Sequence, residues 1–460
     1  MALTADDIIK ATGGELIAGD LKTFSGVSID SRTIAEGEIF FALRGGRFDG
    51  HAFLKDALLK GDGAVTEFVP EILPQGKALV LVRDTLKALQ DSAHYLRMKK
   101  EIPVIAVTGS NGKTTTKEMT YSILSKRFRT LKNEGNLNNH IGLPLSLMRL
   151  ENDHEAAVLE MGMNAPGEIR RLCEIAVPTH GIITNIGSAH LGRLGSHNAV
   201  RSAKLEILHG LNVAVVNADD GFLMEGVTEA GKFNGDIFTF SIKNNAHVVA
   251  KKIEATEKGA RFMLEFKEAE SVTVNLNVHG TFNVYNALAA AAAGFSLGIP
   301  PEEIKGGLEA FSACSMRFEI KKIKGMTLIN DSYNANPSSM DESLKEMKRM
   351  GGQGRTVAVL GDMGELDEFS EEAHKDIGRT IVETGIDVFI AVGRTMSLAA
   401  EECMKIKGKK TGPEIYTFGD ADEAEKNITD VLKAGDTVLV KGSRAMKMEK
   451  IADRICDGEN

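Results

Sequence analysis

The sequence lacks closely spaced cysteines and lacks an excess of basic charge. Its four cysteines (Cys173, Cys314, Cys403 and Cys456) lie far apart without CxxC spacing, which argues against a metal-ligand pattern and is typical of ordinary thiols in a reducing compartment. The formal net charge of −9 argues against a general nucleic-acid binder, which usually carries a basic face. Any phosphate group must therefore be held by a local site.

Long apolar runs are also missing. The N-terminus, "MALTADDIIK", shows no basic start followed by an apolar run, so no signal peptide is visible. The longest run of small apolar residues, residues 287–300, is too short to span a bilayer and is interrupted by glycines and a proline. It suits a tightly packed, alanine-rich helix. We expect a cytoplasmic protein without membrane insertion.

A chain of 460 residues that is 43% hydrophobic is too long for one core and predicts about three domains. Apolar strands alternate with helical stretches throughout, which predicts an α/β fold with mostly parallel sheets. We place the domains at residues 1–100, 101–313 and 314–460, with "MKKEIP" as the first linker. The apolar period changes to two over residues 236–279, which predicts an antiparallel excursion in the central domain.

The stretch "TGSNGKTTT" follows an apolar strand and precedes a helical pattern. Its glycines let backbone N–H groups approach phosphate oxygens, and a helix N-terminus adds positive potential. The lysine would neutralise phosphate charge and a threonine hydroxyl would ligate Mg²⁺. We therefore predict a nucleotide-binding loop made by Gly109, Ser110, Asn111, Gly112, Lys113, Thr114 and Thr115.

Two polar residues follow other strands of the same predicted sheet. Glu160 ends the run "AAVLE", and His190 follows "GIITNIGSA". Ligands collect at the carboxyl ends of parallel strands, so both side chains should lie near the loop. Alone, each has an ordinary interpretation, as a helix-cap carboxylate and a hydrogen-bonded loop histidine. Together with the loop they favour Mg²⁺ ligands.

Lys204 lies on the apolar face of a predicted helix, four residues after Val200 and four before Leu208. An inward lysine needs a partner or an altered charge. The residues alone favour snorkelling, in which the stem is buried and the ammonium reaches water.

Taken together, the motifs resemble those of the Mur ligase family across nearly the whole chain. The N-terminal region supplies "SIDSR" and "FFALRGGRFDGHAF". The central region supplies the loop, "NEGNLNNHIGLPLSL", "EMGMNAPGEI", "TNIGSAHL", "SAKLEI" and "NVYNALAAAAAG". The last region supplies "NDSYNANPSSM", "LGDMGEL" and "VLVKGSRAMKME". "NDSYNANP" points to the branch that adds a dipeptide, because the DNPR-like stretch of the diaminopimelate-adding branch is absent.

The resemblance implies three domains, which bind a UDP-sugar substrate, ATP and the incoming dipeptide in chain order, the last domain being Rossmann-like. The substrates would be UDP-N-acetylmuramoyl-tripeptide and D-Ala-D-Ala, joined in a monomer with ATP and two Mg²⁺ sites. Lys204 matches a lysine that CO₂ carbamylates, which would make it a metal ligand with Thr114, Glu160 and His190. The other matches are Asn283, Arg317 and Asp331 for the nucleotide, Ser28, Asp30, Ser31, Arg32, Asp49 and His51 for UDP, and Asn138, Asn139, Tyr333, Asn334 and Asn336 for the substrate channel and dipeptide.

Three places depart from the family pattern. "LGRLGS" stands where "LE-x-F-GS" is common, so Gly192 and Leu194 differ. Phe282 replaces a histidine before Asn283, and Met316 replaces a glycine before Arg317.

The implied chemistry joins a carboxylate to an amine by way of an acyl phosphate made from ATP. Other ligases with the same mechanism remain alternatives: a different Mur ligase, or a folylpolyglutamate or cyanophycin-type enzyme. A regulator that binds ATP without ligating anything is the alternative from another class. The sequence leaves open whether the third residue of the tripeptide is diaminopimelate or lysine.

Overall fold

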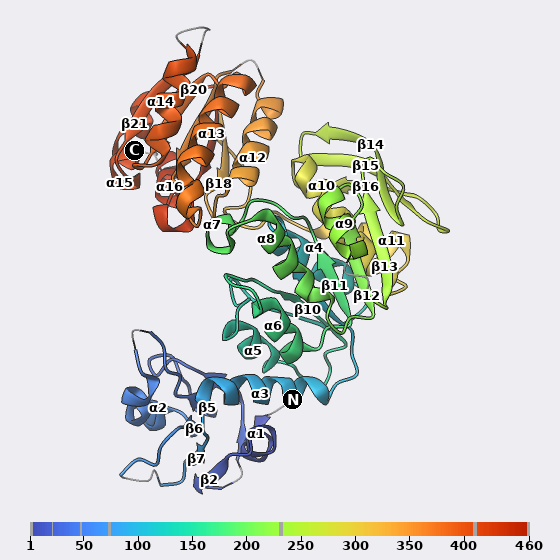
Figure 1. Ribbon diagram of the computed structural model, residues 1–460, viewed down its shortest axis with the longest axis vertical. Helices are drawn as coiled ribbons and strands as arrows, with labels where there is room; N and C mark the ends of the chain where they lie inside the picture. Colours follow the sequence, from blue (N-terminus) through green and yellow to red (C-terminus); the bar gives the residue numbers. More distant parts are fainter. Residues whose placement is uncertain are drawn as a thin grey trace.

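The computed structural model describes residues 3–20, 22–46, 48–71, 75–229, 233–352, 354–407 and 412–457. Within these ranges the strands form sheets of five, nine and six strands and one two-stranded pair. Figure 1 shows the three larger sheets following one another along an open arc, from the blue N-terminal region to the red C-terminal region. This arrangement confirms the predicted α/β class.

The N-terminal sheet has the order β2-β7-β6-β5-β4 and is parallel apart from β2, which runs antiparallel to β7. Helix α1 begins at a capping box, in which the Thr4 and Asp7 side chains each bond the other residue's backbone N–H. The elements are β1 (Leu3–Thr4), α1 (Ala5–Thr12), β2 (Glu15–Ala18), β3 (Thr23–Phe24), β4 (Gly26–Ser28), β5 (Glu38–Phe41), the 3₁₀ turn η1 (Gly50–Phe53), α2 (Leu54–Lys60), β6 (Gly63–Thr66), β7 (Ala78–Leu81) and α3 (Thr85–Met98).

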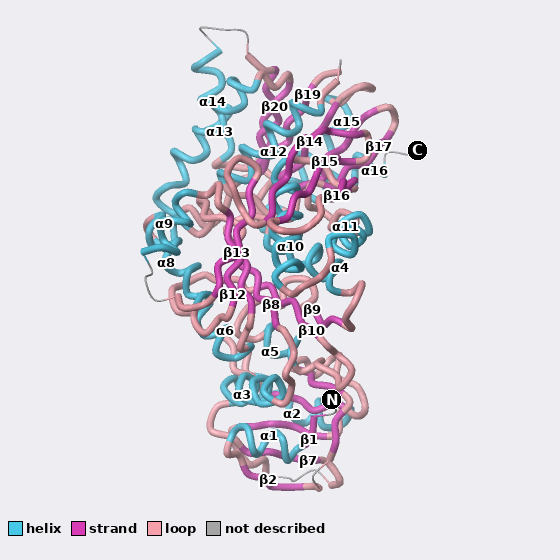
Figure 2. The backbone as a smooth tube through the Cα atoms, turned by 90° about the vertical axis from the view of Figure 1, so that its right-hand side faces the viewer, coloured by secondary structure: helices cyan, strands magenta, loops and turns pink. Residues whose placement is uncertain are grey.

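Helix α3 connects the N-terminal region to the central one. It lies between the N-terminal sheet and helix α5 (Gly142–Leu147), as Figure 2 shows, and one apolar core runs through both regions. The buried Arg97 at the end of α3 donates to the backbone oxygens of Ala176, at 2.9 Å, and Val177, at 3.1 Å. These contacts bind the two regions together by burial and by charge-assisted hydrogen bonds.

The central sheet has the order β16-β15-β14-β13-β12-β11-β8-β10-β9. Strand order reverses around β8, which lies between β10 and β11, so the carboxyl end of β8 is a switch point where ligands bind in such sheets. In chain order, the elements of this region from β8 to β12 are β8 (Val104–Thr108), α4 (Lys113–Leu124), β9 (Thr130–Lys132), α5, β10 (Ala156–Glu160), α6 (Glu168–Ala176), β11 (His180–Ile183), α7 (Leu191–Leu194), α8 (His197–Leu205), the 3₁₀ turn η2 (Glu206–Leu208) and β12 (Val213–Asn217). The rest are α9 (Gly221–Glu229), β13 (Asp236–Ser241), β14 (Val248–Thr256), β15 (Gly259–Phe266), β16 (Val272–Leu276), α10 (Thr281–Ser296) and α11 (Pro301–Ala310).

The antiparallel excursion begins later than predicted. Strand β13 pairs in parallel with β12 and briefly with β14, and antiparallel pairing starts between β14 and β15. The prediction for the β13 segment was wrong because a period of two reports one-sided burial and not the direction of the neighbouring strand. The prediction of a tightly packed, alanine-rich helix at residues 287–300 is confirmed for α10: Ala287 to Ala293 are buried in this helix, which packs against α4.

The C-terminal sheet has the order β17-β18-β22-β19-β20-β21 and is parallel apart from β17. Its elements are β17 (Glu319–Ile323), β18 (Met326–Asp331), α12 (Pro337–Met350), β19 (Thr356–Gly361), the 3₁₀ turn η3 (Asp367–Phe369), α13 (Ser370–Thr384), β20 (Val388–Val392), α14 (Met396–Lys407), β21 (Glu414–Phe418), α15 (Ala421–Val431), β22 (Thr437–Lys441), the 3₁₀ turn η4 (Arg444–Met446) and α16 (Glu449–Asp457). Among the described residues, no helix is both long enough and apolar enough to cross a membrane.

Candidate functional site

The glycine loop lies between β8 and α4, as predicted. Gly109 has a φ of +145° and Gly112 a φ of +79°. A Cβ at Gly109 would meet the Thr184 hydroxyl oxygen at 1.9 Å, and one at Gly112 would meet Asn286 Oδ1 at 2.1 Å. Both positions therefore require glycine, for backbone conformation and for space.

Lys113 folds back over this loop. Its Nζ donates to the backbone oxygens of Gly109, at 2.9 Å, and Ser110, at 3.2 Å. Burial lowers the pKa of Lys113, the carboxylates of Glu160 and Glu365 act to raise it, and Arg317 acts to lower it. The lysine thus lies among charges contributed by both the central and the C-terminal regions.

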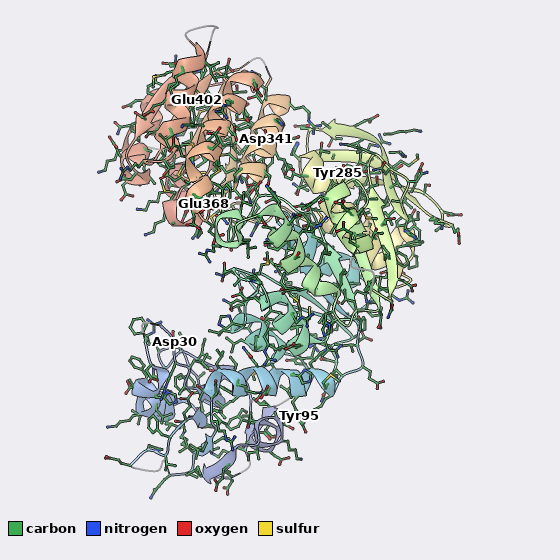
Figure 3. The ribbon with its side chains drawn as sticks, viewed as in Figure 1. Asp30, Tyr95, Tyr285, Asp341, Glu368 and Glu402 are labelled. Carbon is green, nitrogen blue, oxygen red and sulfur yellow. The ribbon has the colours of Figure 1, made fainter. Side chains whose placement is uncertain are left out.

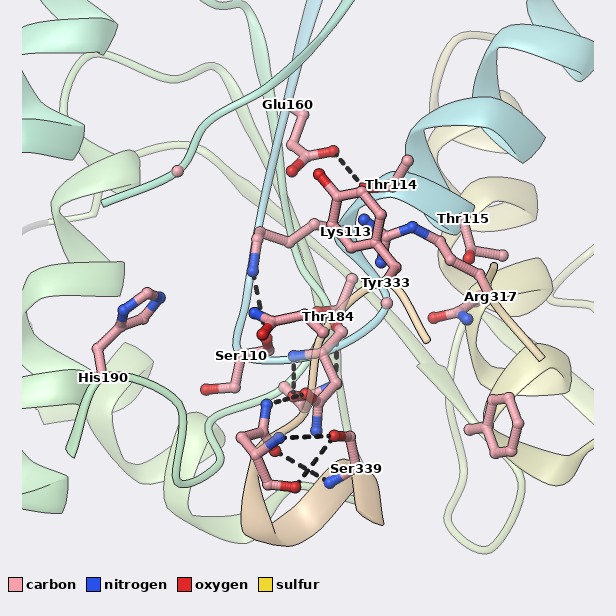
Figure 4. Close-up of a pocket in the computed structure, with 18 of the residues that line it drawn as sticks. Ser110, Lys113, Thr114, Thr115, Glu160, Thr184, His190, Arg317, Tyr333 and Ser339 are labelled. Carbon is pink, nitrogen blue, oxygen red and sulfur yellow. Dashed lines mark hydrogen bonds between the residues drawn. The ribbon is translucent and has the colours of Figure 1, made fainter. Parts of the chain in front are cut away.

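Glu160 is buried at the end of β10 and is held by two predicted site residues. Its Oε2 accepts from the Thr114 hydroxyl at 2.7 Å, and its Oε1 accepts from Asn138 Nδ2 at 2.7 Å. Figure 4 shows the bond between Glu160 and Thr114 beside Lys113. Within the described residues no cation forms an ion pair with this carboxylate, and a buried anion of this kind is costly without a cationic partner.

His190 follows β11 and faces the C-terminal region. Its Nδ1 lies 2.8 Å from Glu365 Oε2, but the two groups are not aligned for a hydrogen bond in this arrangement. The imidazole is the main cause that holds the pKa of Glu365 below its usual range. His190 has a φ of 62°, a left-handed conformation that is uncommon outside glycine.

Lys204 does not reach water, so the snorkelling interpretation was wrong. The residue is 1% exposed in α8, and its Nζ donates to the Gly109 backbone oxygen at 2.9 Å, behind the phosphate loop. Burial and then the nearby Lys113 lower the pKa of Lys204 well below its usual value. The helix is too deeply packed for the stem to carry the ammonium to the surface.

One cavity of about 810 Å³ gathers most of the predicted residues, with walls from the central and C-terminal regions. Gly109, at the start of the loop, and the buried Lys204 are not among the residues that line this cavity. The predicted residues that line the cavity are Ser110, Asn111, Gly112, Lys113, Thr114, Thr115, Asn138, Asn139, Glu160, His190, Asn283, Arg317, Asp331, Tyr333, Asn334 and Asn336.

The C-terminal wall of the cavity carries an arginine stacked on a tyrosine. The Arg317 guanidinium lies 4.0 Å from the centroid of the Tyr333 ring, within cation–π range. Asp331 already accepts from Lys441 Nζ at 2.6 Å and from the Ser343 hydroxyl at 2.8 Å. Its carboxylate is therefore satisfied inside its own domain.

Asn283 and Asn139 likewise have local partners. Asn283 Nδ2 donates to the His279 backbone oxygen at 2.7 Å, and its Oδ1 accepts from Asn286 Nδ2 at 3.1 Å. Asn139 Oδ1 accepts from backbone N–H groups at the start of α5, at 2.8 and 3.1 Å. Both side chains help to shape the cavity wall.

The residues predicted to contact UDP lie in the N-terminal region and do not line this cavity. Arg32 donates to the Asp30 carboxylate from Nε, at 2.9 Å, and from Nη2, at 2.6 Å. These hydrogen bonds lower the pKa of Asp30 to about 2. The Asp49 carboxylate lies 2.6 Å from Nδ1 of the buried His51. Figure 3 places Asp30 on the inner side of the arc. Ser28 bonds the Asp30 backbone, and the Ser31 backbone oxygen accepts from Lys60.

The departures from the family pattern lie where the central and C-terminal regions meet. A Cβ at Gly192 would lie 2.5 Å from the Leu366 backbone carbon, so only glycine admits this approach. Phe282 packs edge-on against Phe318, with ring centroids 5.1 Å apart. Met316 has a φ of 58°, the conformation that a glycine adopts without strain.

Sequence reasoning missed several residues of the cavity. Glu365, Lys441 and Arg444 line it. All three lie in motifs that carried the resemblance, "LGDMGEL" and "VLVKGSRAMKME", so motif membership was the available signal. Their positions depend on contacts between distant segments, which local spacing does not encode.

The donor set fits a divalent cation of the Mg²⁺ type. Such ions prefer carboxylate and hydroxyl oxygens, and Glu160 and Thr114 present both beside the loop. Among the described residues no hydrogen bond engages Nε2 of His190, although the residue lines the cavity. Lys204 fits only after a change of charge, since an ammonium repels a cation.

The fold and the glycine loop define a nucleotide-binding α/β protein. Three family models match the chain: "Mur ligase family, catalytic domain" at residues 23–96, "Mur ligase middle domain" at 107–294 and "Mur ligase, glutamate ligase domain" at 316–444. The UDP-N-acetylmuramoyl-tripeptide--D-alanyl-D-alanine ligase of Bacillus subtilis (strain 168) is 37% identical over 432 residues, 93% of this chain and 92% of that protein.

Solved structures agree with these matches. MurF from Acinetobacter baumannii is 34% identical and superposes with a TM-score of 0.90 over 99% of both chains. MurF ligase from Thermotoga maritima, solved in complex with ADP, is 28% identical with a TM-score of 0.82, covering 94% of this chain and 96% of that one. This chain belongs to the Mur ligase family, which confirms the resemblance seen in its motifs.

Proposed function

We propose that this chain is an ATP-dependent ligase that joins D-Ala-D-Ala to UDP-N-acetylmuramoyl-tripeptide and releases ADP and phosphate. The product is the UDP-linked pentapeptide used in peptidoglycan synthesis. The observation that carries the proposal is full-length similarity to a ligase of that name, at 37% identity over 93% of the chain. A phosphate loop that faces the "NDSYNANP" segment across one cavity supports it.

ATP binds at the glycine loop in this proposal. Backbone N–H groups at residues 112–115, at the N-terminus of α4, hold the phosphates. Lys113 leaves its bonds to the loop carbonyls and neutralises the transferring phosphoryl group. Arg317 and Asp331 reach the phosphates and ribose from the C-terminal region, and Asn283 lies beside the nucleotide.

Thr114, Glu160, His190 and a carbamylated Lys204 would hold Mg²⁺ at two sites, where the cation neutralises charge that develops on phosphate oxygens. Lys204 is suited to carbamylation because its amine is buried with a lowered pKa, and a neutral amine is the form that attacks CO₂. The nitrogen of the neutral amine bonds to the carbon of CO₂ and loses one proton, which gives an anionic carbamate; counted from the ammonium form, two protons leave.

A carboxylate is a poor acyl donor, so the reaction first activates the terminal carboxylate of the tripeptide. The terminal carboxylate of the tripeptide attacks the γ-phosphorus of ATP, ADP leaves, and an acyl phosphate forms, with Lys113 near the transferring group. The free amine of D-Ala-D-Ala attacks the acyl carbon and loses a proton, and phosphate leaves from the tetrahedral intermediate. Both the central and the C-terminal domain line the cavity, and closure of one on the other would exclude water from an intermediate that hydrolyses readily.

Each of the three domains binds a different substrate in this proposal. Residues 1–100 bind the UDP-sugar through Ser28, Asp30, Ser31, Arg32, Asp49 and His51, and residues 101–313 bind ATP. Residues 314–460 receive the dipeptide near Tyr333, Asn334 and Asn336, and Asn138 and Asn139 face the channel between them. A cytoplasmic monomer meets every requirement of this scheme, because all of these residues come from one chain.

Phosphate release tests the proposal. Purified protein with Mg·ATP, D-Ala-D-Ala and UDP-N-acetylmuramoyl-tripeptide should release phosphate only when all three are present. The tripeptide is supplied separately with diaminopimelate and with lysine as its third residue, which identifies the natural version. Lys113→Met serves as the inactive control. Tight ATP binding without turnover on either tripeptide would favour a sister ligase or a regulator.

A further inference from the structure

The loop that follows β19 in the C-terminal region reaches across to α7 in the central region. Its Glu365 makes three contacts there: the carboxylate lies 2.8 Å from His190 Nδ1 and 3.5 Å from Arg193 Nη2, and the backbone oxygen accepts from Gly192 N at 3.2 Å. Gly192 permits this approach because a Cβ would lie 2.5 Å from the Leu366 backbone carbon. The contact therefore depends on a glycine and on the side chains of His190, which precedes α7, and Arg193, which lies within it.

The two residues that meet most closely in this contact, one from each region, both have strained backbones. His190 and Glu365 each have a φ of 62°. Such conformations in non-glycine residues are unfavourable and tend to persist at functional sites, where the surrounding structure fixes them. The pair is also too exposed to be a strong source of stability, since the Glu365 side chain is 36% exposed and surface ion pairs contribute little. The strained backbones are therefore better explained by a role in positioning the two side chains than by a contribution to stability.

The geometry leaves the other ring nitrogen of His190 available. A carboxylate at Nδ1 favours the tautomer that carries its proton there, which makes Nε2 the lone-pair nitrogen. Histidines that bind metals commonly donate their second N–H to a carboxylate in this way, and the partner orients the ring and raises its basicity. Glu365 also lines the cavity that the phosphate loop lines, and it lies near enough to Lys113 to act to raise the pKa of that lysine.

We infer that Glu365 is a positioning residue that orients His190 toward the metal of the phosphate site, supplied by the C-terminal domain. The inference rests on the proposed function, which places Mg²⁺ at His190. A small rotation of the ring or the carboxylate aligns the N–H with Glu365 when the metal binds. Because the carboxylate and the histidine belong to different domains, full metal affinity requires the C-terminal domain to be docked.

Metal binding tests this without relying on turnover. Mn²⁺ affinity is measured by electron paramagnetic resonance with a non-hydrolysable ATP analogue, for the wild type, Glu365→Ala and Glu365→Gln. Glu365→Ala should bind Mn²⁺ about tenfold more weakly, the lower end of the range for lost metal-supporting carboxylates. Glu365→Gln, which keeps an acceptor without the charge, should lie between the two. Glu368→Ala is the matched control: it removes an exposed carboxylate from the 3₁₀ turn η3, which follows this loop, and should match the wild type.

A double-mutant cycle separates orientation of the ring from a general charge effect. In a His190→Ala background, Glu365→Ala should have no further effect on Mn²⁺ affinity, because Glu365 acts through the histidine. Gly192→Ala keeps both side chains and should still weaken binding, because the new Cβ pushes the loop away.

Two results would overturn the inference while leaving the proposed function intact: wild-type affinity in Glu365→Ala, or an equal loss with and without His190. Wild-type affinity in His190→Ala itself would overturn the inference together with the proposed metal site.

Discussion

The side chains of Asn336 and Asn111 join the C-terminal domain to the phosphate loop. Asn336 Nδ2 donates to Asn111 Oδ1 at 2.8 Å, and Asn111 Nδ2 donates to the Ser338 hydroxyl at 2.9 Å. The same Asn336 caps α12, because its Oδ1 accepts from Ser339 N at 3.0 Å. One residue thus begins the helix after the proposed dipeptide segment and contacts the loop that holds ATP.

Asn111→Ala should weaken use of the dipeptide while leaving the fold intact. It removes both bonds across the domains but not the α12 cap, and two hydrogen bonds at about 1 kcal/mol each correspond to a ten- to thirtyfold loss in kcat/KM. Phosphate release measured against D-Ala-D-Ala concentration gives that value. Asn336→Ala removes only one of the two bonds across the domains, so its loss in kcat/KM should be smaller, about fivefold, and its stability should fall by about 1 kcal/mol because the cap is lost. A rise in the KM for ATP alone would assign Asn111 to nucleotide binding only.

Ligase activity should depend on CO₂ through Lys204. Burial lowers the pKa of this amine, which favours the neutral form that attacks CO₂, and the proposed carbamate supplies an anion that Lys204→Met cannot. We expect wild-type activity to fall in CO₂-stripped buffer and to return on addition of bicarbonate, and Lys204→Met to be inactive under both conditions. Carbon-13 NMR after equilibration with labelled bicarbonate should show a carbamate signal in the wild type that Lys204→Met lacks. Undiminished activity without CO₂ would contradict the assignment.

Met316→Gly should stabilise the C-terminal region. At a φ of 58° the left-handed backbone conformation costs a methionine about 1 kcal/mol in free energy relative to glycine. Met316→Ala is the control, because both variants lose the contact between the Met316 sulfur and Arg444 while alanine keeps the strain. Thermal unfolding should rank the glycine variant above the alanine variant by about that amount. Equal stabilities would show that the backbone is not strained there.

Acid should destabilise the central domain through His180. This histidine is buried in β11, and burial lowers its pKa from 6.5 to about 4. Between these values the unfolded chain binds a proton that the folded chain does not, so stability falls as pH drops from 6.5 to 4 and changes no further below that. The full effect is at most about 3 kcal/mol.

Denaturant unfolding between pH 7.5 and 4 measures this effect. His180→Gln should lose less stability over that range than the wild type, and a variant of the exposed His209, His209→Gln, should follow the wild type. Parallel curves for all three proteins would show that His180 does not titrate between the two states as described.

Local signals predicted the phosphate loop, because the required glycines and the strand and helix around them adjoin in sequence. Helical periodicity placed Lys204 on the apolar face of its helix, but the residues alone favoured snorkelling and could not identify the Gly109 carbonyl as its partner. The contact between His190 and Glu365 was beyond such reasoning, since it forms only when two domains meet. Met316 replaces a glycine of the family pattern, and the structure gives it a left-handed backbone conformation that the sequence analysis did not predict.

Isotope transfer tests the central claim, that ATP activates the tripeptide carboxylate. The tripeptide is prepared with ¹⁸O in its terminal carboxylate and incubated with ATP, D-Ala-D-Ala and the enzyme, and the released phosphate is analysed by mass spectrometry. The acyl-phosphate route moves one carboxylate oxygen into each phosphate, so we predict one ¹⁸O in each phosphate formed during synthesis of the pentapeptide. Unlabelled phosphate from the same reaction would contradict the route, because the oxygen would then have come from water.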